Sequence, residues 1–285
     1  MGSQPLTSDG LVPNEPGTPV FLPVGSGESA REIAVLSRSG TSPGIFWLGG
    51  FGSTMRGSKA TALDSFARDT GLAMVRFDYS DHGESFGRFE EGTITRWLEE
   101  ARTVFDRLAT QPQIVVGSSM GGWIALLLAT ALRGTEAATR IAGLVLIAPA
   151  VDMTHDLMWE RMDKKTRAAL AEVGSVPIPD SGLPITQALI EDGKRHLFGD
   201  RLIDVGCPVT IVQGVRDVEV PYRHTEKLVS RLASDDVVLT LIKDGDHRLS
   251  RPEDLSLITG AVQRMVGDFD PGRFAPSGQP GQGQQ

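Results

Sequence analysis

One ten-residue stretch, residues 114–123, constrains the fold of this chain more than any other. It reads Ile-Val-Val-Gly-Ser-Ser-Met-Gly-Gly-Trp, so a β-branched run ends at a glycine-flanked serine and an apolar run follows at once. This pattern predicts a strand, a tight turn and a buried helix, with the hydroxyl of Ser119 lifted above the end of a sheet. A strand that leads directly into a helix favours an α/β fold.

The surroundings of Ser119 matter because Gly-x-Ser-x-Gly occurs three times in the chain. The copy around Ser42 contains Pro43 and precedes a strand-like run, which predicts a loop between strands. The copy around Ser85 lies several residues beyond the strand-like run 72–77, and no helical pattern starts there. Ser119 has a strand before it and a helix after it, so we predict that Ser119 is the nucleophile.

The composition argues against several classes of protein. The net charge of −8 is unlike that of a nucleic-acid binder, which needs a basic patch for the phosphates. The single cysteine, Cys207, excludes an internal disulfide and a multi-cysteine zinc site, and we expect it to be a small core residue. No run of 18 apolar residues occurs, so no membrane span is expected.

We expect an enzyme without a metal or a cofactor. No cluster of metal-ligand residues stands out, and no phosphate-binding loop of the type Gly-x-x-x-x-Gly-Lys is present. The N-terminus has no basic segment followed by an apolar core, and its first 30 residues contain no basic residue. Neither a secretory signal nor a mitochondrial transit peptide is therefore expected, and we predict a cytoplasmic location.

Strand and helix patterns alternate through residues 19–150 and 206–268, which predicts a mostly parallel sheet with helices on both faces. Residues 1–18 and 269–285 are rich in Pro, Gly, Ser and Gln and are predicted to be disordered tails. Besides the strand before Ser119, we predict strands at residues 20–23, 33–37, 45–48, 72–77, 141–147, 208–212 and 237–242. We predict helices at residues 59–70, 120–132, 222–232 and 252–266, and a further one, second in chain order, with apolar positions from Trp97 to Leu108. Thr93 is the expected cap of the second helix, whose apolar stripe leaves Glu99, Glu100, Arg102 and Arg107 outside it.

Residues 151–205 break this alternation and are predicted to form a helical lid over the strand ends. Two helix-like pieces, 157–173 and 185–198, are joined by a proline-rich segment. The apolar side chains of the lid have two possible roles: they line a substrate pocket, or they dock the lid onto the body. Our candidates for substrate contact are Met153, Leu157, Trp159 and Met162.

A serine hydroxyl is a poor nucleophile at neutral pH, so it needs a base that an acid orients. In α/β-hydrolases the chain order is serine, acid, histidine. His247 follows the last predicted strand, and loops at the carboxyl ends of parallel strands face one crevice. His224 falls within a helix pattern and is expected on the surface, while His82, His155 and His196 precede the strand that is expected to carry the acid. We therefore predict that His247 is the base.

The acid is expected in the loop of residues 214–221, which offers Asp217 and Glu219. Asp217 is favoured because it lies nearer the end of the preceding strand. Asp244 and Asp246 share a tight turn with the base and are interpreted as turn formers.

An oxyanion that develops on the acyl group needs two backbone N–H donors. One is expected from Met120, the residue after the nucleophile, and the other from Phe51 in the glycine-rich loop 49–52. The alternative is that these glycines only permit a turn. His82 and Ser85 are expected to stabilise a loop near the site rather than to catalyse.

Four longer strings resemble one subgroup of the α/β-hydrolase family, typified by alpha/beta-hydrolase domain-containing protein 10. They are Phe-Trp-Leu-x-Gly-Phe at 46–51, Arg-Phe-Asp-Tyr-Ser at 76–80, Gly-Ser-Ser-Met-Gly-Gly-Trp at 117–123 and Asp-His-Arg at 246–248. The resemblance spans about residues 44–266 and is weak in the lid. It implies a triad of Ser119, Asp217 and His247, and hydrolysis of a thioester such as S-palmitoyl-cysteine or of an oxygen ester.

The function expected from the sequence is therefore that of a serine hydrolase, with a small-molecule or acylated-protein ester or thioester as its substrate. Two alternatives remain open. The same triad and fold support carbon–carbon bond hydrolysis or dienelactone opening, and the scaffold also occurs in non-catalytic ligand receptors.

Overall fold

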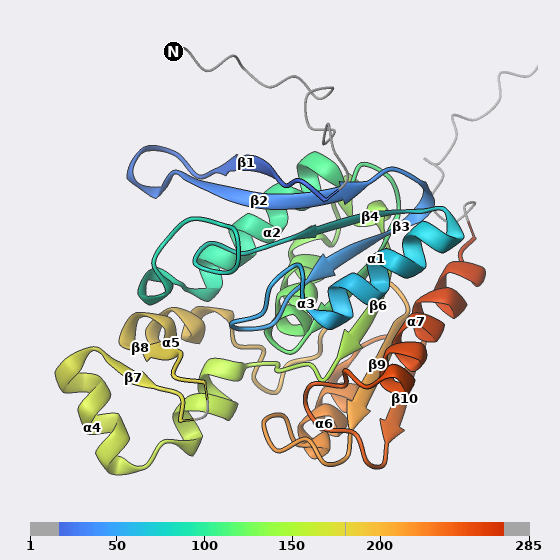
Figure 1. Cartoon of the computed structure of the whole chain (residues 1–285). Helices are drawn as coiled ribbons and strands as arrows, with labels where there is room; N and C mark the ends of the chain where they lie inside the picture. Colours follow the sequence, from blue (N-terminus) through green and yellow to red (C-terminus); the bar gives the residue numbers. More distant parts are fainter. Residues whose placement is uncertain (1–16, 180, 271–285) are drawn as a thin grey trace, which may run out of the picture.

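A computed structural model describes residues 17–179 and 181–270 of the chain, and its centre is an eight-stranded sheet in the order β1-β2-β4-β3-β5-β6-β9-β10 (Figure 1). The first two strands pair antiparallel, as do β2 and β4, whereas all later pairs are parallel. The strands are β1 (Val20–Val24), β2 (Arg31–Arg38), β3 (Thr41–Leu48), β4 (Leu72–Phe77), β5 (Gln113–Ser118), β6 (Ile141–Ile147), β9 (Val209–Gly214) and β10 (Val237–Ile242). The mostly parallel α/β sheet predicted from the sequence is confirmed.

The strand that leads to the predicted nucleophile lies in the middle of this sheet. β5 pairs with β3 on one side and β6 on the other, and Gly117 near its end is opposite Leu48 and Leu146. Every residue of β5 is buried. A strand covered on both faces carries a continuous apolar run, which explains the composition of residues 114–116.

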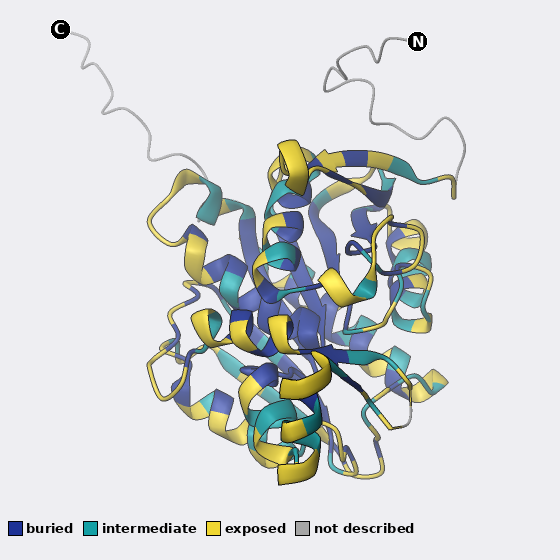
Figure 2. Cartoon of the chain, turned by 90° about the vertical axis from the view of Figure 1, so that its left-hand side faces the viewer, coloured by how far each residue is buried: buried dark blue, intermediate teal, exposed yellow. Residues whose placement is uncertain are grey.

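Helices cover both faces of the sheet, as the alternating pattern predicts. Trp97, Trp123 and Leu228 belong to one buried cluster with one face, and Leu63 and Ile258 belong to a second cluster with the other. Figure 2 shows the sheet as the buried interior, with exposed residues on the outer sides of the helices. The helices concerned are α1 (Ser58–Thr70), α2 (Ile94–Leu108), α3 (Met120–Leu132), α6 (Tyr222–Arg231) and α7 (Pro252–Gly267).

The helix ends follow the expected capping chemistry. The side chain of Thr93 accepts a hydrogen bond from the backbone N–H of Arg96 and begins α2. Gly71, with φ 73°, ends α1 in the left-handed conformation that glycine adopts without strain.

The prediction that Glu100 lies outside the buried face of α2 is wrong. Its side chain is fully buried, and its carboxylate accepts hydrogen bonds from the N–H (2.9 Å) and the hydroxyl (2.6 Å) of Ser80. It also forms an ion pair with Arg31 of β2, whose side chain is 5% exposed. The partner is 69 residues away in the chain, so the helical pattern of α2 contains no sign of it.

The loop predicted around Ser42 is part of β3 instead. β3 begins at Thr41, which pairs with Leu72, and the register shifts before Ile45. Such an irregularity accommodates a proline within a strand, which explains why Pro43 does not end the pairing.

The lid also differs in detail from the two predicted helices. The piece expected at 157–173 is divided into a π-helical turn (Thr154–Met158), a 3-10 turn (Trp159–Arg161) and α4 (Lys164–Val173). The cause is Asp163, whose carboxylate accepts from the N–H of Thr166 and starts a new helix. Figure 1 shows the lid at the lower left, on the side to which the arrowheads of β3 and β6 point.

The second lid helix is shorter than the predicted range 185–198. Residues Pro184–Thr186 form β8, which pairs antiparallel with β7 (Ser175–Pro177). The α-helix that follows, α5 (Gln187–Gly193), is capped by the side chain of Thr186 and continues as one 3-10 turn. The first residues of the predicted second lid helix therefore form a β-strand instead.

The two ends of the lid are tied together at its base. The carboxylate of Asp152 accepts hydrogen bonds from the N–H groups of Phe198 (2.8 Å) and Gly199 (3.0 Å). His224 Nε2 lies 2.8 Å from the carbonyl oxygen of Val151. This histidine lies on a helix, as expected, but its side chain is only partly exposed because it packs against the base of the lid. Burial lowers the pKa of His224, which favours the neutral imidazole that donates this bond.

The predicted tails 1–18 and 269–285 lie outside the described residues except for two residues of each. None of the helices among the described residues combines the length and the apolar content that a membrane span requires. No group of three or more His, Cys, Asp or Glu side chains there is placed to hold a metal ion.

The buried ion pair predicts an asymmetric response to mutation. We expect Glu100→Ala to lower the free energy of unfolding by about 3–5 kcal/mol, because it removes the buried carboxylate that pairs with the guanidinium of Arg31 and leaves only the half-exposed carboxylate of Glu99 as its charged partner. Glu99, whose side chain is 49% exposed, is the matched control, and Glu99→Ala is expected to cost less than about 1 kcal/mol. Urea unfolding measures both values. Equal losses in the two variants would contradict this account.

Candidate active site

The turn between β5 and α3 holds Ser119 in a conformation that L-residues rarely adopt, with φ 54° and ψ −118°. Three backbone hydrogen bonds fix it there. The N–H of Ser119 donates to the carbonyl oxygen of Ile147 (2.8 Å), and its carbonyl oxygen accepts from Gly122 (2.9 Å) and Ala150 (3.0 Å). The neighbouring strand β6 and the residues after it thus hold the strained residue in place.

The glycines around Ser119 are needed for space rather than for flexibility. A Cβ on Gly117 would lie 2.3 Å from the carbonyl oxygen of Gly121, and a Cβ on Gly121 would lie 2.1 Å from that of Leu48. No side chain fits at either position without moving the backbone. This close approach of α3 to β3 and β5 explains the Gly-x-Ser-x-Gly pattern at this copy.

The structure brings Ser119, His247 and Asp217 together from three loops. His247 Nε2 lies 3.1 Å from Ser119 Oγ, and His247 Nδ1 lies 2.8 Å from Asp217 Oδ2. The serine follows β5, the aspartate follows β9 and the histidine follows β10. The histidine side chain is 16% exposed and the aspartate side chain is fully buried, so the base reaches solvent and the acid does not.

Of the two acids offered by the loop, Asp217 contacts the nitrogen of His247 that faces away from the serine. Its Oδ1 accepts from the N–H groups of Glu219 (2.9 Å) and Val220 (2.8 Å), which fix the carboxylate. Glu219 approaches the opposite nitrogen, with Oε2 3.6 Å from Nε2, and its side chain is 65% exposed. Its position beside Nε2 does not orient the ring toward the serine.

A buried glutamine near the acid was missed in the sequence. Gln213 is the penultimate residue of β9, and its side-chain amide nitrogen lies 3.2 Å from Asp217 Oδ2 and 3.0 Å from the carbonyl oxygen of Val220. Its amide oxygen accepts from the hydroxyl of Thr225 (2.7 Å). A glutamine at the end of an apolar strand is the signal that could have found it, because a buried amide needs several hydrogen-bond partners.

The loop of His247 is held by side chains on both sides of it. Asp246 accepts from the N–H of Leu249 (3.0 Å), and Asp244 pairs with Arg251, so the predicted roles of both aspartates in shaping the turn are confirmed. Lys59 of α1 donates to the carbonyl oxygen of Arg248, next to the histidine. Burial lowers the pKa of Lys59.

The glycine-rich loop after β3 forms a turn against the nucleophile. The N–H of Ser53 donates to the carbonyl oxygen of Gly50 (3.0 Å), and Gly52 has φ 71°, as the third residue of a type II turn requires. A Cβ on Gly50 would lie 3.2 Å from the Cβ of Ser119, so the turn packs directly on the serine. Within the described residues the N–H of Phe51 forms no hydrogen bond.

The second predicted donor, the N–H of Met120, belongs to the first residue of α3. A helix begins with N–H groups that have no acceptor in the helix itself, and its dipole favours negative charge there. Phe51 and Met120 therefore flank the serine, and their role as oxyanion donors stays a prediction.

His82 and Ser85 lie in the loop after β4, where both act as predicted. The hydroxyl of Ser85 donates to the carbonyl oxygen of Asp78 (2.6 Å) and accepts from the N–H of Ala34 (2.8 Å). His82 is 3% exposed, and its ring nitrogens contact Gly52 and Ser80. The two side chains tie this loop to β2 and to the glycine-rich turn.

The four lid residues predicted to contact substrate are divided between two apolar clusters. Met153 is 5% exposed in the main core, and Leu157 packs against that core. Trp159 and Met162 pack against a small cluster inside the lid that includes Leu170. The docking interpretation accounts for these contacts, and substrate contact by the four residues stays a prediction.

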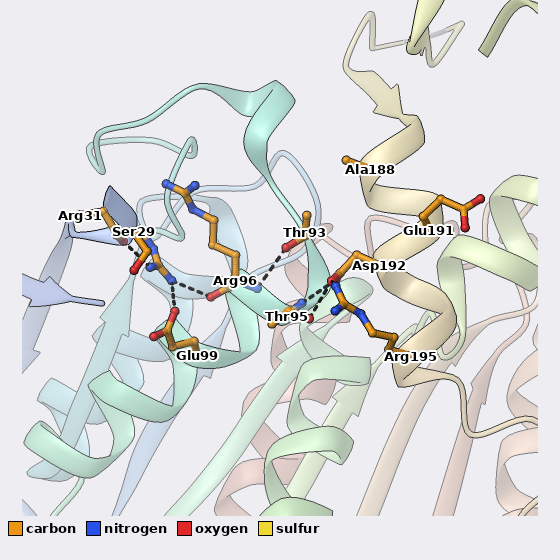
Figure 3. Close-up of a pocket in the computed structure, with 10 residues that line it drawn as sticks. All are labelled: Ser29, Arg31, Thr93, Thr95, Arg96, Glu99, Ala188, Glu191, Asp192 and Arg195. Atoms are coloured by element: carbon orange, nitrogen blue, oxygen red, sulfur yellow. Dashed lines mark hydrogen bonds and ion pairs between the residues drawn. The ribbon is translucent and has the colours of Figure 1, made fainter. Parts of the chain in front are cut away.

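A separate cavity of about 510 Å³ lies between the start of α2, β2 and α5 (Figure 3). Two ion pairs lie among its side chains: Arg31 with Glu99 at 2.9 Å, and Arg195 with Asp192. None of its lining residues belongs to the three loops that meet at Ser119. The residues are Ser29, Arg31, Thr93, Thr95, Arg96, Glu99, Ala188, Glu191, Asp192 and Arg195.

Comparison with known proteins gives the family. The model of the family described as "Serine aminopeptidase, S33" matches residues 45–187, from β3 through the elbow into the lid. The mitochondrial palmitoyl-protein thioesterase ABHD10 of Bos taurus is 33% identical over 239 residues, which are 82% of this chain and 76% of that protein. That relative is a mitochondrial protein by name, and the cytoplasmic location of this chain stays a prediction.

Two solved structures are similar over most of their length. A putative hydrolase from Agrobacterium vitis S4 is 47% identical with a TM-score of 0.83, covering 87% of this chain and 98% of that one. Mouse alpha/beta hydrolase domain-containing protein 10 is 29% identical with a TM-score of 0.79, covering 88% and 99%. The chain therefore belongs to the α/β-hydrolase family, as a serine hydrolase related to the ABHD10 palmitoyl-protein thioesterases.

Proposed function

We propose that this protein hydrolyses acyl esters or thioesters through a Ser119–His247–Asp217 triad and a covalent acyl-enzyme. One observation carries the proposal: the continuous contact from Ser119 Oγ to His247 Nε2 (3.1 Å) and from His247 Nδ1 to Asp217 Oδ2 (2.8 Å). Hydrogen-bond contact between a nucleophile, a base and an orienting acid is the geometry that this chemistry needs.

In the first half of the reaction, Ser119 Oγ attacks the acyl carbonyl carbon while His247 Nε2 takes the hydroxyl proton. Asp217 holds the ring with Nδ1–H toward its carboxylate and stabilises the imidazolium that forms. The tetrahedral intermediate then collapses, and the thiol or alcohol leaves with the proton that Nε2 returns. The acyl group remains on the serine oxygen.

In the second half, water attacks the acyl-enzyme, and His247 Nε2 takes one of its protons. The carboxylic acid is released and Ser119 Oγ regains its proton. In both halves negative charge develops on the acyl oxygen, where the N–H groups of Phe51 and Met120 would donate hydrogen bonds. These two donors stabilise the transition state more than the ground state, because the negative charge is absent from the ground state.

The proposed substrate is an acyl thioester or ester with an apolar acyl chain. This proposal is supported by the relation to the palmitoyl-protein thioesterases. The triad chemistry itself fits both a thiol and an alcohol as the leaving group.

The two acids of the 214–221 loop provide a matched pair of variants. We expect Asp217→Asn to lower kcat by about 10³–10⁴, because the amide no longer holds the ring in the required tautomer. Glu219→Gln is expected to change kcat by about fivefold or less, since an exposed charge pair is worth at most about 1 kcal/mol. Hydrolysis of p-nitrophenyl butyrate measures both. A larger loss of kcat in Glu219→Gln than in Asp217→Asn would instead identify Glu219 as the acid of the triad.

The acyl preference can be measured with a chain-length series. For acyl thioesters of four to eight carbons, we expect kcat/KM to rise on the order of 10², because each methylene buried in an apolar site contributes about 0.8 kcal/mol. A parallel p-nitrophenyl ester series compares esters with thioesters, and Ser119→Ala gives the background rate.

Two outcomes would contradict the proposed substrate class. A flat series would mean that the acyl chain is not bound, and that recognition lies with the leaving group. Absence of hydrolysis of every ester and thioester, combined with turnover of a dienelactone or a carbon–carbon bond substrate, would replace the proposed reaction.

A further inference from the structure

We propose that His82 is a positioning residue of this active site: its buried imidazole holds the turn of residues 50–53 so that the N–H of Phe51 can reach the acyl oxygen at Ser119. The inference rests on the proposed function, because it concerns the oxyanion site of that reaction. His82 touches neither the serine nor the substrate in this mechanism. It acts through the turn.

The turn lies between the nucleophile and His82. On one side, Gly50 packs against Ser119, where an added Cβ would lie 3.2 Å from the serine Cβ. On the other side, the N–H of Gly52 donates to His82 Nε2 at 3.0 Å. Of the two N–H groups at the tip of the turn, the histidine binds that of Gly52, and the preceding one, from Phe51, forms no hydrogen bond with the described residues.

The second ring nitrogen sets the tautomer that this contact requires. His82 Nδ1 lies 3.0 Å from the carbonyl oxygen of Ser80, which accepts hydrogen bonds and cannot donate them. Nδ1 therefore carries the proton, and Nε2 has a lone pair for the N–H of Gly52. Burial lowers the pKa of His82 and keeps this neutral form at neutral pH, since an imidazolium has no acceptor.

Aromatic packing fixes the orientation of the imidazole. Its ring centroid lies 5.0 Å from that of Phe89, 5.5 Å from that of Trp97 and 5.9 Å from that of Tyr79. The ring of Phe51 packs edge-on against two of these same rings, Phe89 (5.0 Å) and Trp97 (5.8 Å). The side chain of Phe51 and the backbone of Gly52 are thus held by one group of packed aromatic rings.

Misalignment of the Phe51 N–H is expected to affect kcat rather than KM. One oxyanion donor contributes on the order of 10²–10³ in kcat, so misaligning this donor also lowers kcat. The charge on the acyl oxygen develops in the transition state, so kcat falls while KM changes little. A general weakening of the fold would instead lower the melting temperature without this separation.

Two amide substitutions separate the two contacts of the ring. In His82→Asn, the shorter amide can donate to Ser80 as Nδ1 does, but it does not reach Gly52. In His82→Gln, the longer side chain places an acceptor near the position of Nε2. We expect His82→Asn to lower kcat about 10- to 100-fold with KM within about threefold, and His82→Gln to stay within about fivefold of the wild type.

Ser85→Ala is the control for the loop itself. It removes two hydrogen bonds of the same loop, to Ala34 and Asp78, without touching the turn. We expect it to lower the melting temperature and leave kcat near the wild-type value. Circular dichroism and thermal melting show whether each variant is folded. Hydrogen exchange of the Gly52 amide in the wild-type protein needs no variant, and we expect this amide to be protected.

Four results would overturn the inference: an unchanged kcat in folded His82→Asn, an equal loss in His82→Gln, an equal loss in Ser85→Ala, or an unprotected Gly52 amide. Its failure is distinct from failure of the proposed function. An active wild type with an inactive Ser119→Ala variant and an unaffected His82→Asn variant would refute this inference alone. A wild type without ester or thioester hydrolysis would refute the proposed function.

Discussion

The strained backbone of Ser119 is the constraint on which the rest of the site depends. A residue with φ 54° persists because its N–H and carbonyl oxygen are bound by Ile147 and Ala150 at the end of β6. The same turn begins α3 with no space for a side chain at Gly117 or Gly121. One junction between a central strand and a buried helix therefore fixes the direction of the hydroxyl, and every other group of the site is placed relative to it.

The remaining groups come from loops that side chains elsewhere hold in place. Gln213 and the N–H groups after Asp217 fix the acid, and Lys59 binds the loop that carries His247. These supports lie outside the triad, in a strand end and in a surface helix. The two loops follow neighbouring parallel strands, so the sheet sets the distance between Asp217 and His247. The contacts of Gln213 and Lys59 then orient the acid and the loop of the base.

Much of this arrangement could be predicted from the sequence, because it depends on local patterns and on chain order. Apolar runs located the central strands, capping residues located the helix ends, and the order of serine, acid and histidine led to Asp217 and His247. Failures occurred where a distant partner decides. Glu100 is buried because of Arg31, which is distant in the chain, and Gln213 acts through contacts that no periodicity reveals. The first lid helix differs for a local reason, because the cap at Asp163 interrupts it.

The central claim is that Ser119 is the nucleophile, and labelling with a fluorophosphonate probe tests it most directly. Such a probe reacts with a serine that a neighbouring base activates. Our account predicts that one equivalent is bound, that peptide mass mapping places it on Ser119, and that folded Ser119→Ala is not labelled. Stoichiometric labelling of Ser119→Ala, or a label on Ser42 or Ser85 of the wild-type protein, would contradict it.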